Sequence, residues 1–341
     1  MIRWLLIPVL FVSACPLAEG EGCEEREEGA LLARISSPIT LRPEVLRTRE
    51  AVIGSLAADA FLTGFNGERD RCSAFSQNAE ACVDLAFQNA GGLRDETRCG
   101  LRSEWREGGL YQRDLEELMP FENPMQAIYV RGHDLLTGME LGVSLLGEPG
   151  RFAKNGAFLH LAGAAVMVDC GGKARMVNGQ SEVVEPGARV LGICLRHWSA
   201  GGDSEPSWSL VDREATYTVA TNSYIAGGGD GFSMLTEVDS EGNRIPKLTP
   251  ISSPGTDQSL LGDYLNRLSA EGERVINPSG VTQPPNFDCP DVRIPLADVG
   301  ARLDALAEDP SCQIDAGELV CSFSNLRMTL LRSTYCFDFG E

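Results

Sequence analysis

The stretch YTVATNSYIAGGGDGF, residues 217–232, joins a predicted strand to a loop that is rich in glycine. Apolar and polar residues alternate at its start, as they do in a half-buried β-strand. The loop then holds four glycines and one aspartate in residues 227–231, between the rings of Tyr224 and Phe232. Glycines of this kind either form a flexible turn or let the backbone pass close to a ligand, and this stretch alone leaves both interpretations open.

The sequence around this stretch mixes helices and strands. Hydrophobic residues at helical spacing predict helices over residues 43–65, 133–146 and 259–272. Strands are predicted over residues 83–89, 126–132 and 216–226, with a long hairpin built from residues 164–170 and 188–196. Because these elements do not alternate strictly as βαβ units, we expect a mixed α/β (α+β) fold, with a partly antiparallel sheet and flanking helices.

Composition and charge limit the partners of the chain. It has 341 residues, of which 43% are hydrophobic, so it can bury a core. There are 49 Asp and Glu residues against 29 Lys and Arg, which gives a formal net charge of −20. This charge repels phosphate polymers, so we expect no nucleic-acid partner. Any phosphate that the chain recognises should belong to a small molecule.

The N-terminal sequence MIRWLLIPVLFVSAC predicts an export signal over residues 1–14, because one basic residue precedes a short apolar run. Its last four residues resemble a bacterial lipobox, in which the cysteine is lipidated; a plain secretory signal is the alternative. We therefore expect a lipid anchor at Cys15 and a location in the bacterial cell envelope, either periplasmic or at the cell surface. The acidic sequence that follows predicts a solvated tether over residues 15–35.

The cysteines agree with export. Of the 11 in the chain, ten remain when Cys15 is set aside, and an even set in an exported chain predicts disulfides. Zinc binding is the alternative, but no C-x2-C pair occurs and the chain has only three histidines. Among the possible bridges we prefer Cys170 with Cys194, at the ends of the hairpin strands. The cysteine-rich end of the chain predicts a small stapled appendage over residues 281–341.

Familiar catalytic motifs do not occur. The sequence has no G-x-S-x-G, H-E-x-x-H or P-loop motif, which mark serine hydrolases, zincins and P-loop NTPases. A two-metal phosphoesterase needs several His, Asp and Asn ligands around ions ~3.5–4 Å apart, and three scattered histidines do not supply them. We expect no catalytic residue, metal ligand or cofactor in this chain. Each histidine is predicted to be structural, His160 in the apolar FLHLAG above all.

Binding residues are expected on the loops at the ends of the predicted elements. Arg47, Arg49 and Arg94 lie on such loops and have the fork geometry that binds anions. The rings of Phe121 and Tyr224 have the shape to stack on a flat ligand from both sides. Solvation of the arginines and core packing of the rings are the alternatives.

The order of these loops resembles the C-terminal domain of the 5'-nucleotidase family. RTREAVIGSLAADA, VDLAFQNAGGLR, GGLYQRDLEELMPFENPMQAIYVRGHDLL, FLHLAGAAVMVD and YTVATNSYIAGGGDGF follow one another as in that family, and the resemblance covers residues 36–280. In the family this domain recognises the nucleotide, and a separate N-terminal metallophosphatase domain hydrolyses it. The resemblance implies the same domain fold here.

The resemblance also implies roles at the base and ribose. Phe121 and Tyr224 match the two rings that clamp the base in relatives, although Tyr224 replaces the commoner phenylalanine. Asn123 matches a position that hydrogen-bonds the base. Asp230 matches the position that binds the ribose hydroxyls, and a carboxylate suits this role because it accepts two hydrogen bonds.

A second set of matched residues lies toward the phosphate. Arg94, with Asn89 beside it and Arg47 before the first helix, matches the positions that hold ribose and phosphate. Val52 departs from the family, because relatives usually carry a polar asparagine there.

The metallophosphatase signatures D-x-H and G-N-H-D/E are not found in the sequence, and the short G-D signature occurs without them. We therefore expect a nucleoside- or nucleotide-recognition subunit that acts in nucleotide catabolism or salvage with a separate metallophosphatase, which would hold the divalent metals. The alternative is a non-catalytic binding or interaction lipoprotein that keeps the fold, and a hydrolase using unmatched residues is a third. The retained pocket residues favour the first interpretation, whereas Val52 and the cysteine-rich end favour the second.

Overall fold

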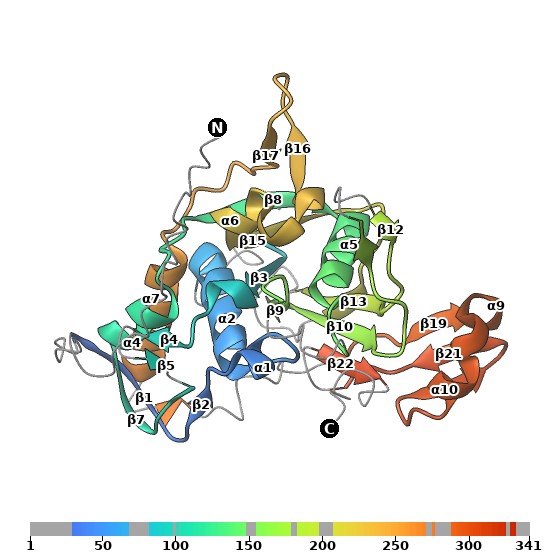
Figure 1. The fold of residues 1–341 in the computed structure, drawn as a ribbon, viewed down its shortest axis with the longest axis horizontal. Helices are drawn as coiled ribbons and strands as arrows, with labels where there is room; N and C mark the ends of the chain where they lie inside the picture. The colour runs from blue at the N-terminus through green and yellow to red at the C-terminus, as the bar shows by residue number, and fades with distance from the viewer. Residues whose placement is uncertain are drawn as a thin grey trace, which may run out of the picture.

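The computed structural model describes residues 29–67, 82–97, 100–101, 103–147, 155–178, 183–197, 207–270, 275–276, 288–324 and 328–331. Within these ranges the fold is mixed α/β (Figure 1). The predicted signal peptide over residues 1–14, the lipidation site Cys15 and most of the acidic tether lie outside the described residues. None of the helices that the structure describes is both long enough and apolar enough to span a bilayer.

A four-stranded mixed sheet forms the centre of the fold. Its order is β8 (Met125–Arg131), β15 (Thr216–Asn222), β3 (Leu85–Asn89) and β9 (Leu159–Ala162). β15 runs parallel to β3, whereas the two outer pairings are antiparallel. Every residue of β3 is buried, because strands cover both of its edges and helices pack on the sheet. The predicted partly antiparallel sheet is confirmed.

Three longer helices flank this centre. α2 (Val52–Asn66) packs against β3 and β9, and α7 (Asp257–Ala270) packs on the other side of α2. α5 (Gly132–Gly142) follows β8 directly and lies over β13 (Val190–His197) of a second sheet. Figure 1 shows α2 between α7 and the sheet. The predicted helices over residues 133–146 and 259–272 are confirmed within a few residues.

The first predicted helix is interrupted, contrary to the expectation of one helix over residues 43–65. α1 (Pro43–Leu46) ends at Arg47, and α2 begins only at Val52. Ala51 before α2 is extended, with φ −130° and ψ 140°. The Nε2 atom of His160 lies 2.9 Å from the carbonyl oxygen of Leu46. A tertiary contact therefore supplies a hydrogen-bond partner for the last carbonyl group of α1. Local helical spacing does not encode this contact.

The chain passes from the central sheet into a second sheet at Gly163. β9 ends at Ala162 and β10 (Ala164–Asp169) begins after this single residue. Gly163 has φ 72°, and a Cβ atom there would lie 2.9 Å from the carbonyl oxygen of Asp84, so only glycine fits the bend. The second sheet has the order β14 (Ser207–Leu210), β13 (Val190–His197), β10 and β22 (Met328–Leu331). The antiparallel β10–β13 pair confirms the predicted long hairpin.

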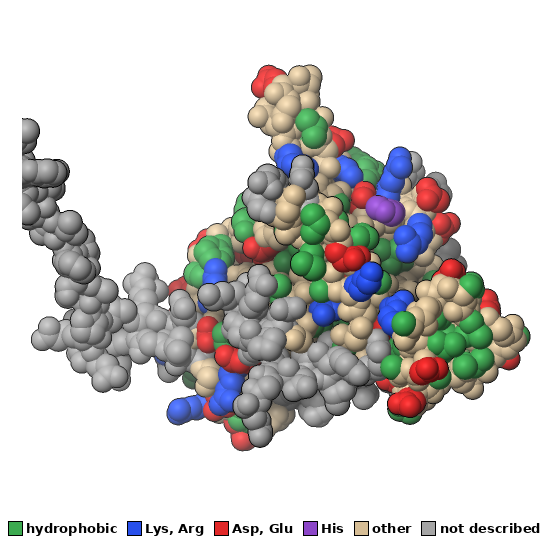
Figure 2. Space-filling model, turned by 45° about the vertical axis from the view of Figure 1, so that its right-hand side comes forward, with side chains coloured by type: hydrophobic (Ala, Val, Ile, Leu, Met, Phe, Trp, Pro, Cys, Tyr) green, Lys and Arg blue, Asp and Glu red, His purple; other side chains and the backbone are tan. Residues whose placement is uncertain are grey.

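Short pairs of strands complete the body. β1 (Leu31–Ile35) lies between β18 (Val275–Ile276) and β7 (Gly108–Tyr111), and α4 (Gln112–Leu118) follows β7. The remaining pairs are β2 (Ile39–Thr40) with β6 (Glu104–Trp105), β4 (Glu96–Thr97) with β5 (Gly100–Leu101), β11 (Met176–Val177) with β12 (Val183–Glu185), and β16 (Thr236–Val238) with β17 (Arg244–Pro246). The β16–β17 hairpin projects from the body, at the top of Figure 1 and Figure 2.

Residues 31–35, predicted as the end of the acidic tether, form the strand β1. Leu32, Ala33 and Ile35 are buried in the main core, so residues 31–35 belong to the folded body. The short sequence LLARI pairs with residues far away in the chain, and no nearby sequence signal marks that pairing. The other predicted domain boundaries stay predictions.

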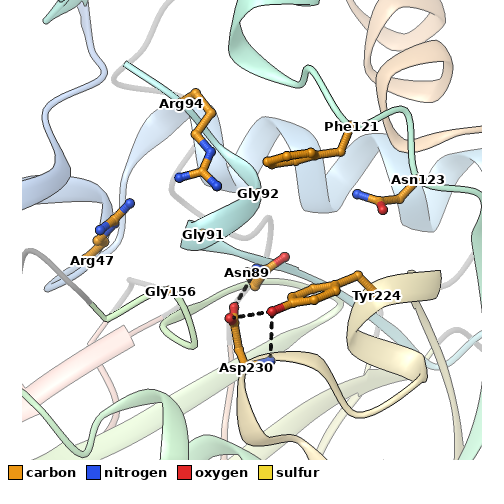
Figure 3. A pocket seen from close by; sticks show the side chains of 10 residues that line it. All are labelled: Arg47, Asn89, Gly91, Gly92, Arg94, Phe121, Asn123, Gly156, Tyr224 and Asp230. Atoms are coloured by element: carbon orange, nitrogen blue, oxygen red, sulfur yellow. Dashed lines mark hydrogen bonds between the residues drawn. The ribbon is translucent and has the colours of Figure 1, made fainter. Parts of the chain in front are cut away.

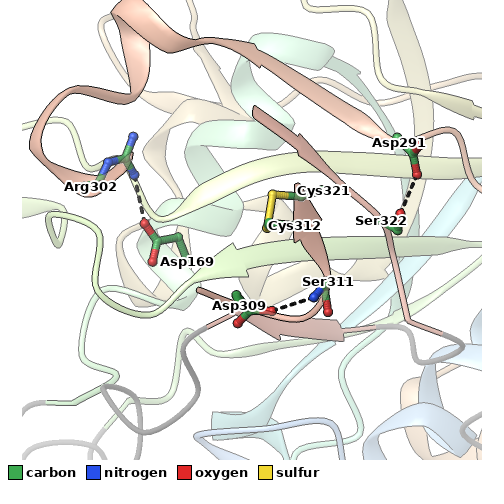
Figure 4. Close-up of a disulfide and its surroundings, with 8 residues drawn as sticks. All are labelled: Asp169, Asp291, Arg302, Asp309, Ser311, Cys312, Cys321 and Ser322. Carbon is green, nitrogen blue, oxygen red and sulfur yellow. Dashed lines mark hydrogen bonds and ion pairs between the residues drawn. A yellow bond between two sulfur atoms is a disulfide. The ribbon is translucent and has the colours of Figure 1, made fainter. Parts of the chain in front are cut away.

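Residues 288–324 form a small unit, whose hydrophobic cluster also includes Met167 of β10 and Leu331 of β22. It contains β19 (Val292–Pro295), α9 (Leu296–Val299), α10 (Leu303–Ala307), β20 (Cys312–Asp315) and β21 (Glu318–Cys321). A Cys312–Cys321 disulfide joins β20 to β21 (Figure 4). Arg302 ties the unit to the end of β10 through a 3.1 Å ion pair with the fully buried Asp169.

The preferred bridge between Cys170 and Cys194 is wrong. Cys194 is bonded to Cys289, at a sequence separation of 95 residues. The register of the hairpin explains this, because Cys194 pairs with Ala165 and Cys170 lies five positions further along. At ~3.4 Å per residue this offset is roughly 17 Å, beyond the reach of a disulfide. Cys170 and Cys82 each take part in a disulfide as well. The expectation of disulfides is therefore confirmed.

Candidate functional site

Three loops meet at one edge of the central sheet. Asn89 ends β3 and Tyr224 follows β15, which runs parallel to β3, so both reach the same edge. β8 is antiparallel to β15, and therefore the residues that precede β8, including Phe121 and Asn123, lie at this edge too. A cavity of 490 Å³ opens there (Figure 3). Its lining residues are Arg47, Asn89, Gly91, Gly92, Arg94, Phe121, Asn123, Gly156, Tyr224 and Asp230.

This cavity brings together all seven residues predicted for substrate binding. Arg49, the further candidate for an anion, is exposed and does not line the cavity. Val52, the departure from the family, is half-buried at the start of α2 and does not line it either. The substitution at Val52 therefore leaves the described wall of the cavity unchanged.

Two aromatic rings face the opening from opposite sides (Figure 3). The side chain of Phe121 is 52% exposed and that of Tyr224 is 50% exposed, although large rings are usually buried. The guanidinium carbon of Arg94 lies 4.9 Å from the centre of the Phe121 ring, a cation–π contact. The rings thus leave apolar faces available to a flat ligand.

Asp230 is fixed by hydrogen bonds from both sides. Asn89 Nδ2 donates to its Oδ2 atom at 2.9 Å, and the Tyr224 hydroxyl donates to its Oδ1 atom at 2.9 Å. The backbone N–H of Asp230 donates to the Tyr224 hydroxyl oxygen at 3.2 Å. Asp230 itself has φ 51°, a left-handed conformation that aspartate tolerates. Each carboxylate oxygen keeps a lone pair for a further donor.

The hydroxyl that distinguishes Tyr224 from phenylalanine thus has a structural role. It orients the carboxylate of Asp230, a function that the sequence did not predict. The pKa of Tyr224 is raised, first because the phenol is partly buried and then because Asp230 lies beside it. The phenol therefore stays protonated at neutral pH and acts as the donor.

Two buried polar residues behind the site were missed by sequence reasoning. Asn222 Nδ2 donates to Asn89 Oδ1 at 3.1 Å, and Gln88 Nε2 donates to the Asn89 carbonyl oxygen at 2.8 Å. The bond from Asn222 determines which end of the Asn89 amide faces Asp230. The sequence offered one signal for these two residues. Each of two apolar strands carries an amide side chain near its end, and a buried amide needs a hydrogen-bond partner.

Gly156 also escaped prediction, because it comes from a loop outside the recognised motifs. A Cβ atom at this position would lie 3.0 Å from Oδ2 of Asp230, and one at Gly91 would lie 3.1 Å from the same oxygen. Glycine at both positions avoids this close contact with the carboxylate of Asp230.

Two arginines form the other end of the cavity (Figure 3). The pKa of Arg47 is lowered, first by partial burial and then by the positive charge of Arg94. Asp230 and Asp95 act in the opposite direction but less strongly. Two like charges that share a partly buried cavity wall favour an anion between them.

His160 has a structural environment, as predicted. Its ring is buried, bonded to Leu46 and edge-on to Phe158. His197 Nε2 lies 2.7 Å from the Ser209 hydroxyl, and His133 is exposed. In the described part of the chain, no group of three or more His, Cys, Asp or Glu side chains is placed to hold a metal ion. That divalent metals belong to a separate partner stays a prediction.

Comparison with known proteins gives consistent matches. The chain is 25% identical over 225 residues to a snake venom 5'-nucleotidase from Crotalus adamanteus, covering 66% of this chain and 32% of that protein. It is 30% identical over 157 residues to a probable 5'-nucleotidase from Treponema pallidum, covering 46% and 22%. A solved 5'-nucleotidase precursor from Thermus thermophilus matches with 25% identity and a TM-score of 0.48, covering 70% and 36%.

The chain thus spans about a third of the length of several curated relatives, and less of the Treponema pallidum protein. A family model described as "5'-nucleotidase, C-terminal domain" matches residues 32–237, which is more than half of the chain. This match includes every residue that lines the cavity. The chain belongs to the 5'-nucleotidase C-terminal domain family.

Proposed function

We propose that the cavity binds a nucleoside or nucleotide. The base stacks between Phe121 and Tyr224, and Asp230 accepts hydrogen bonds from the ribose hydroxyls. Arg47 and Arg94 bind the phosphate. The observation that carries this proposal is the pair of half-exposed rings facing each other across a cavity that also holds a fixed carboxylate and two arginines.

We further propose that the chain is the recognition subunit of a nucleotidase, whose dimetal phosphatase is a separate protein. It would act in nucleotide catabolism or salvage at the bacterial cell envelope, anchored through lipidated Cys15. The disulfides Cys194–Cys289 and Cys312–Cys321 support an oxidising compartment. The metal-dependent partner would supply the activated water that attacks phosphorus, whereas this chain would orient the nucleotide.

Isothermal titration calorimetry of the full chain with adenosine, AMP and 2',3'-dideoxyadenosine tests the binding proposal. We expect saturable binding of adenosine and AMP at micromolar to millimolar concentrations. Absence of saturable binding at millimolar concentration for all three ligands would leave the non-catalytic interaction protein as the better interpretation. Hydrolysis of AMP that appears only when a metallophosphatase is added would support the division of labour between two chains.

Tyr224→Ala should weaken adenosine binding by about 5- to 150-fold, because base–aromatic stacking contributes roughly 1–3 kcal/mol per base. The same substitution frees the carboxylate of Asp230, which adds to the loss. Tyr224→Phe keeps the stacking ring and removes only the hydroxyl, so it should cost less than Tyr224→Ala. Equal losses in the two variants, measured by calorimetry, would argue against stacking.

Asp230→Ala should weaken the binding of ribonucleosides more than the binding of their dideoxy analogues. Only ribonucleosides offer the vicinal hydroxyls that a carboxylate accepts, and a hydrogen bond to a charged group contributes about 1.5–3 kcal/mol. We expect the affinity for adenosine to fall by at least tenfold more than the affinity for 2',3'-dideoxyadenosine. A parallel loss for both ligands would show that Asp230 acts only on the shape of the loop.

A further inference from the structure

The segment that leads into α7 holds the loop over residues 119–125, which carries Phe121 and Asn123. This segment, residues 255–258, lies beyond the region matched by the family model, which ends at residue 237. Three hydrogen bonds join it to the loop: Met125 N to Gly255 O at 2.9 Å, Asp257 N to Asn123 O at 2.9 Å, and Gln258 Nε2 to Met119 O at 3.0 Å. One wall of the cavity is therefore supported by a part of the chain that the family match does not include.

The fourth contact reaches a cavity-lining side chain directly. Nδ2 of Asn123 donates to Oδ2 of Asp257 at 3.1 Å, and Oδ1 of Asp257 accepts from the backbone N–H of Gln258 at 2.8 Å. Asp257 is only 1% exposed, so its carboxylate has little alternative solvation by water.

An ionised carboxylate only accepts hydrogen bonds, and this settles which end of the Asn123 amide carries the nitrogen. One N–H of Asn123 is committed to Asp257. The second N–H and the Oδ1 atom remain for a ligand in the cavity, as a donor and an acceptor in a fixed order. If the amide turned over, its oxygen would face the carboxylate, and two acceptors would be left in contact.

We propose that Asp257 is a positioning residue that fixes the Asn123 amide, so that the cavity selects adenine over hypoxanthine. The inference rests on the proposed nucleoside binding. Adenine presents its 6-amino donor next to the N7 acceptor, and an asparagine amide pairs with these two groups at once. Hypoxanthine has the same shape but presents two acceptors, O6 and N7, along this edge. A fixed amide then meets O6 with its own oxygen.

The experiment compares adenosine with inosine, which differ only in the group at position 6. Calorimetry with the full chain is run at pH 8, because burial raises the pKa of Asp257 and the carboxylate must be ionised. For the unmodified protein we expect adenosine to bind about tenfold more tightly than inosine. In Asp257→Asn this ratio should fall to about twofold or less, because an amide at position 257 either accepts or donates and lets Asn123 turn over.

Two control variants separate positioning from general support of the loop. Asp263→Asn makes the same chemical change at an exposed position of α7 and should leave the ratio unchanged. Gln258→Ala removes a contact with the loop but not with the amide, so it should weaken both nucleosides equally and keep the ratio. Asn123→Ala removes the amide itself and should bring the ratio of the affinities for adenosine and inosine close to one. This variant provides a test even if Asp257→Asn fails to fold.

The possible outcomes are distinct. Equal binding of adenosine and inosine by the unmodified protein, or tighter binding of inosine, overturns the inference and leaves nucleoside binding standing. A ratio that survives in Asp257→Asn, with the fold verified by circular dichroism, also overturns it. Failure of the unmodified protein to bind either nucleoside overturns the proposed function and this inference together.

Discussion

Arg302→Ala should lower the free energy of unfolding by about 3–5 kcal/mol, because it removes a guanidinium that pairs with a buried carboxylate. Arg302 Nη1 lies 3.1 Å from Oδ2 of Asp169, a residue with no exposed surface, and donates to the carbonyl oxygen of Ala188 at 2.8 Å. Figure 4 shows this arginine reaching from the C-terminal unit to the end of β10. Urea denaturation with intact disulfides provides the measurement.

A matched control lies in the same unit. Arg293 forms ion pairs with Asp315 at 3.5 Å and Glu318 at 3.4 Å, but its side chain is half exposed. Exposed pairs contribute roughly 0–1 kcal/mol, so Arg293→Ala should have a small effect. If the two alanine variants unfold at the same urea concentration, the buried pair does not secure the C-terminal unit.

Glu140→Gln should stabilise the protein by about 3 kcal/mol at pH 8 and have little effect near pH 4.5, at roughly 1.4 kcal/mol per pKa unit. Glu140 on α5 is 8% exposed, and its Oε1 atom accepts from the backbone N–H of Val190 at 2.7 Å. Its Oε2 atom is buried without a hydrogen-bond partner among the described residues. Burial is the main reason that the pKa of Glu140 is raised to about 7.

The sign follows from proton binding. Between pH 4.5 and 7 the native state keeps the proton of Glu140 and the unfolded state releases it, so stability falls as the pH rises. The loss is complete above pH 7, and glutamine, which is neutral throughout, escapes it. If the difference in the free energy of unfolding between Glu140→Gln and the unmodified protein does not change from pH 5 to pH 8, the raised pKa of Glu140 is contradicted. Glu237→Gln, at an exposed position, serves as the control.

The sequence predicted the parts of the structure that local patterns encode. The predicted strands over residues 83–89 and 216–226 alternate or form apolar runs, and the structure places β3 and β15 side by side in one sheet. Residues 223–226, predicted as the end of the second strand, form the short helix α6 (Ser223–Ala226). Asn89, Arg94, Tyr224 and Asp230 end or follow these strands, so the recognised motifs were sufficient to bring them to one cavity, whereas Gly156 comes from outside these motifs.

The errors concern contacts between residues far apart in the chain. The carbonyl group of Leu46, where the first helix breaks, contacts His160, which is 114 residues away. The partner of Cys194, Cys289, lies 95 residues away, outside the predicted hairpin. Asp257 reaches Asn123 from a helix that the family motifs do not include. Helical spacing, cysteine parity and motif order carry no information on such contacts.

The hydrogen bonds that hold Asp230 have a kinetic consequence. Its carboxylate is already oriented by Asn89 and Tyr224 before any ligand arrives, so a ribose would meet a formed acceptor and not a mobile loop. Binding that requires no prior rearrangement avoids the entropy of ordering side chains and proceeds at a rate limited by encounter and orientation. Differences in affinity among ligands of this cavity would then appear mainly as differences in residence time.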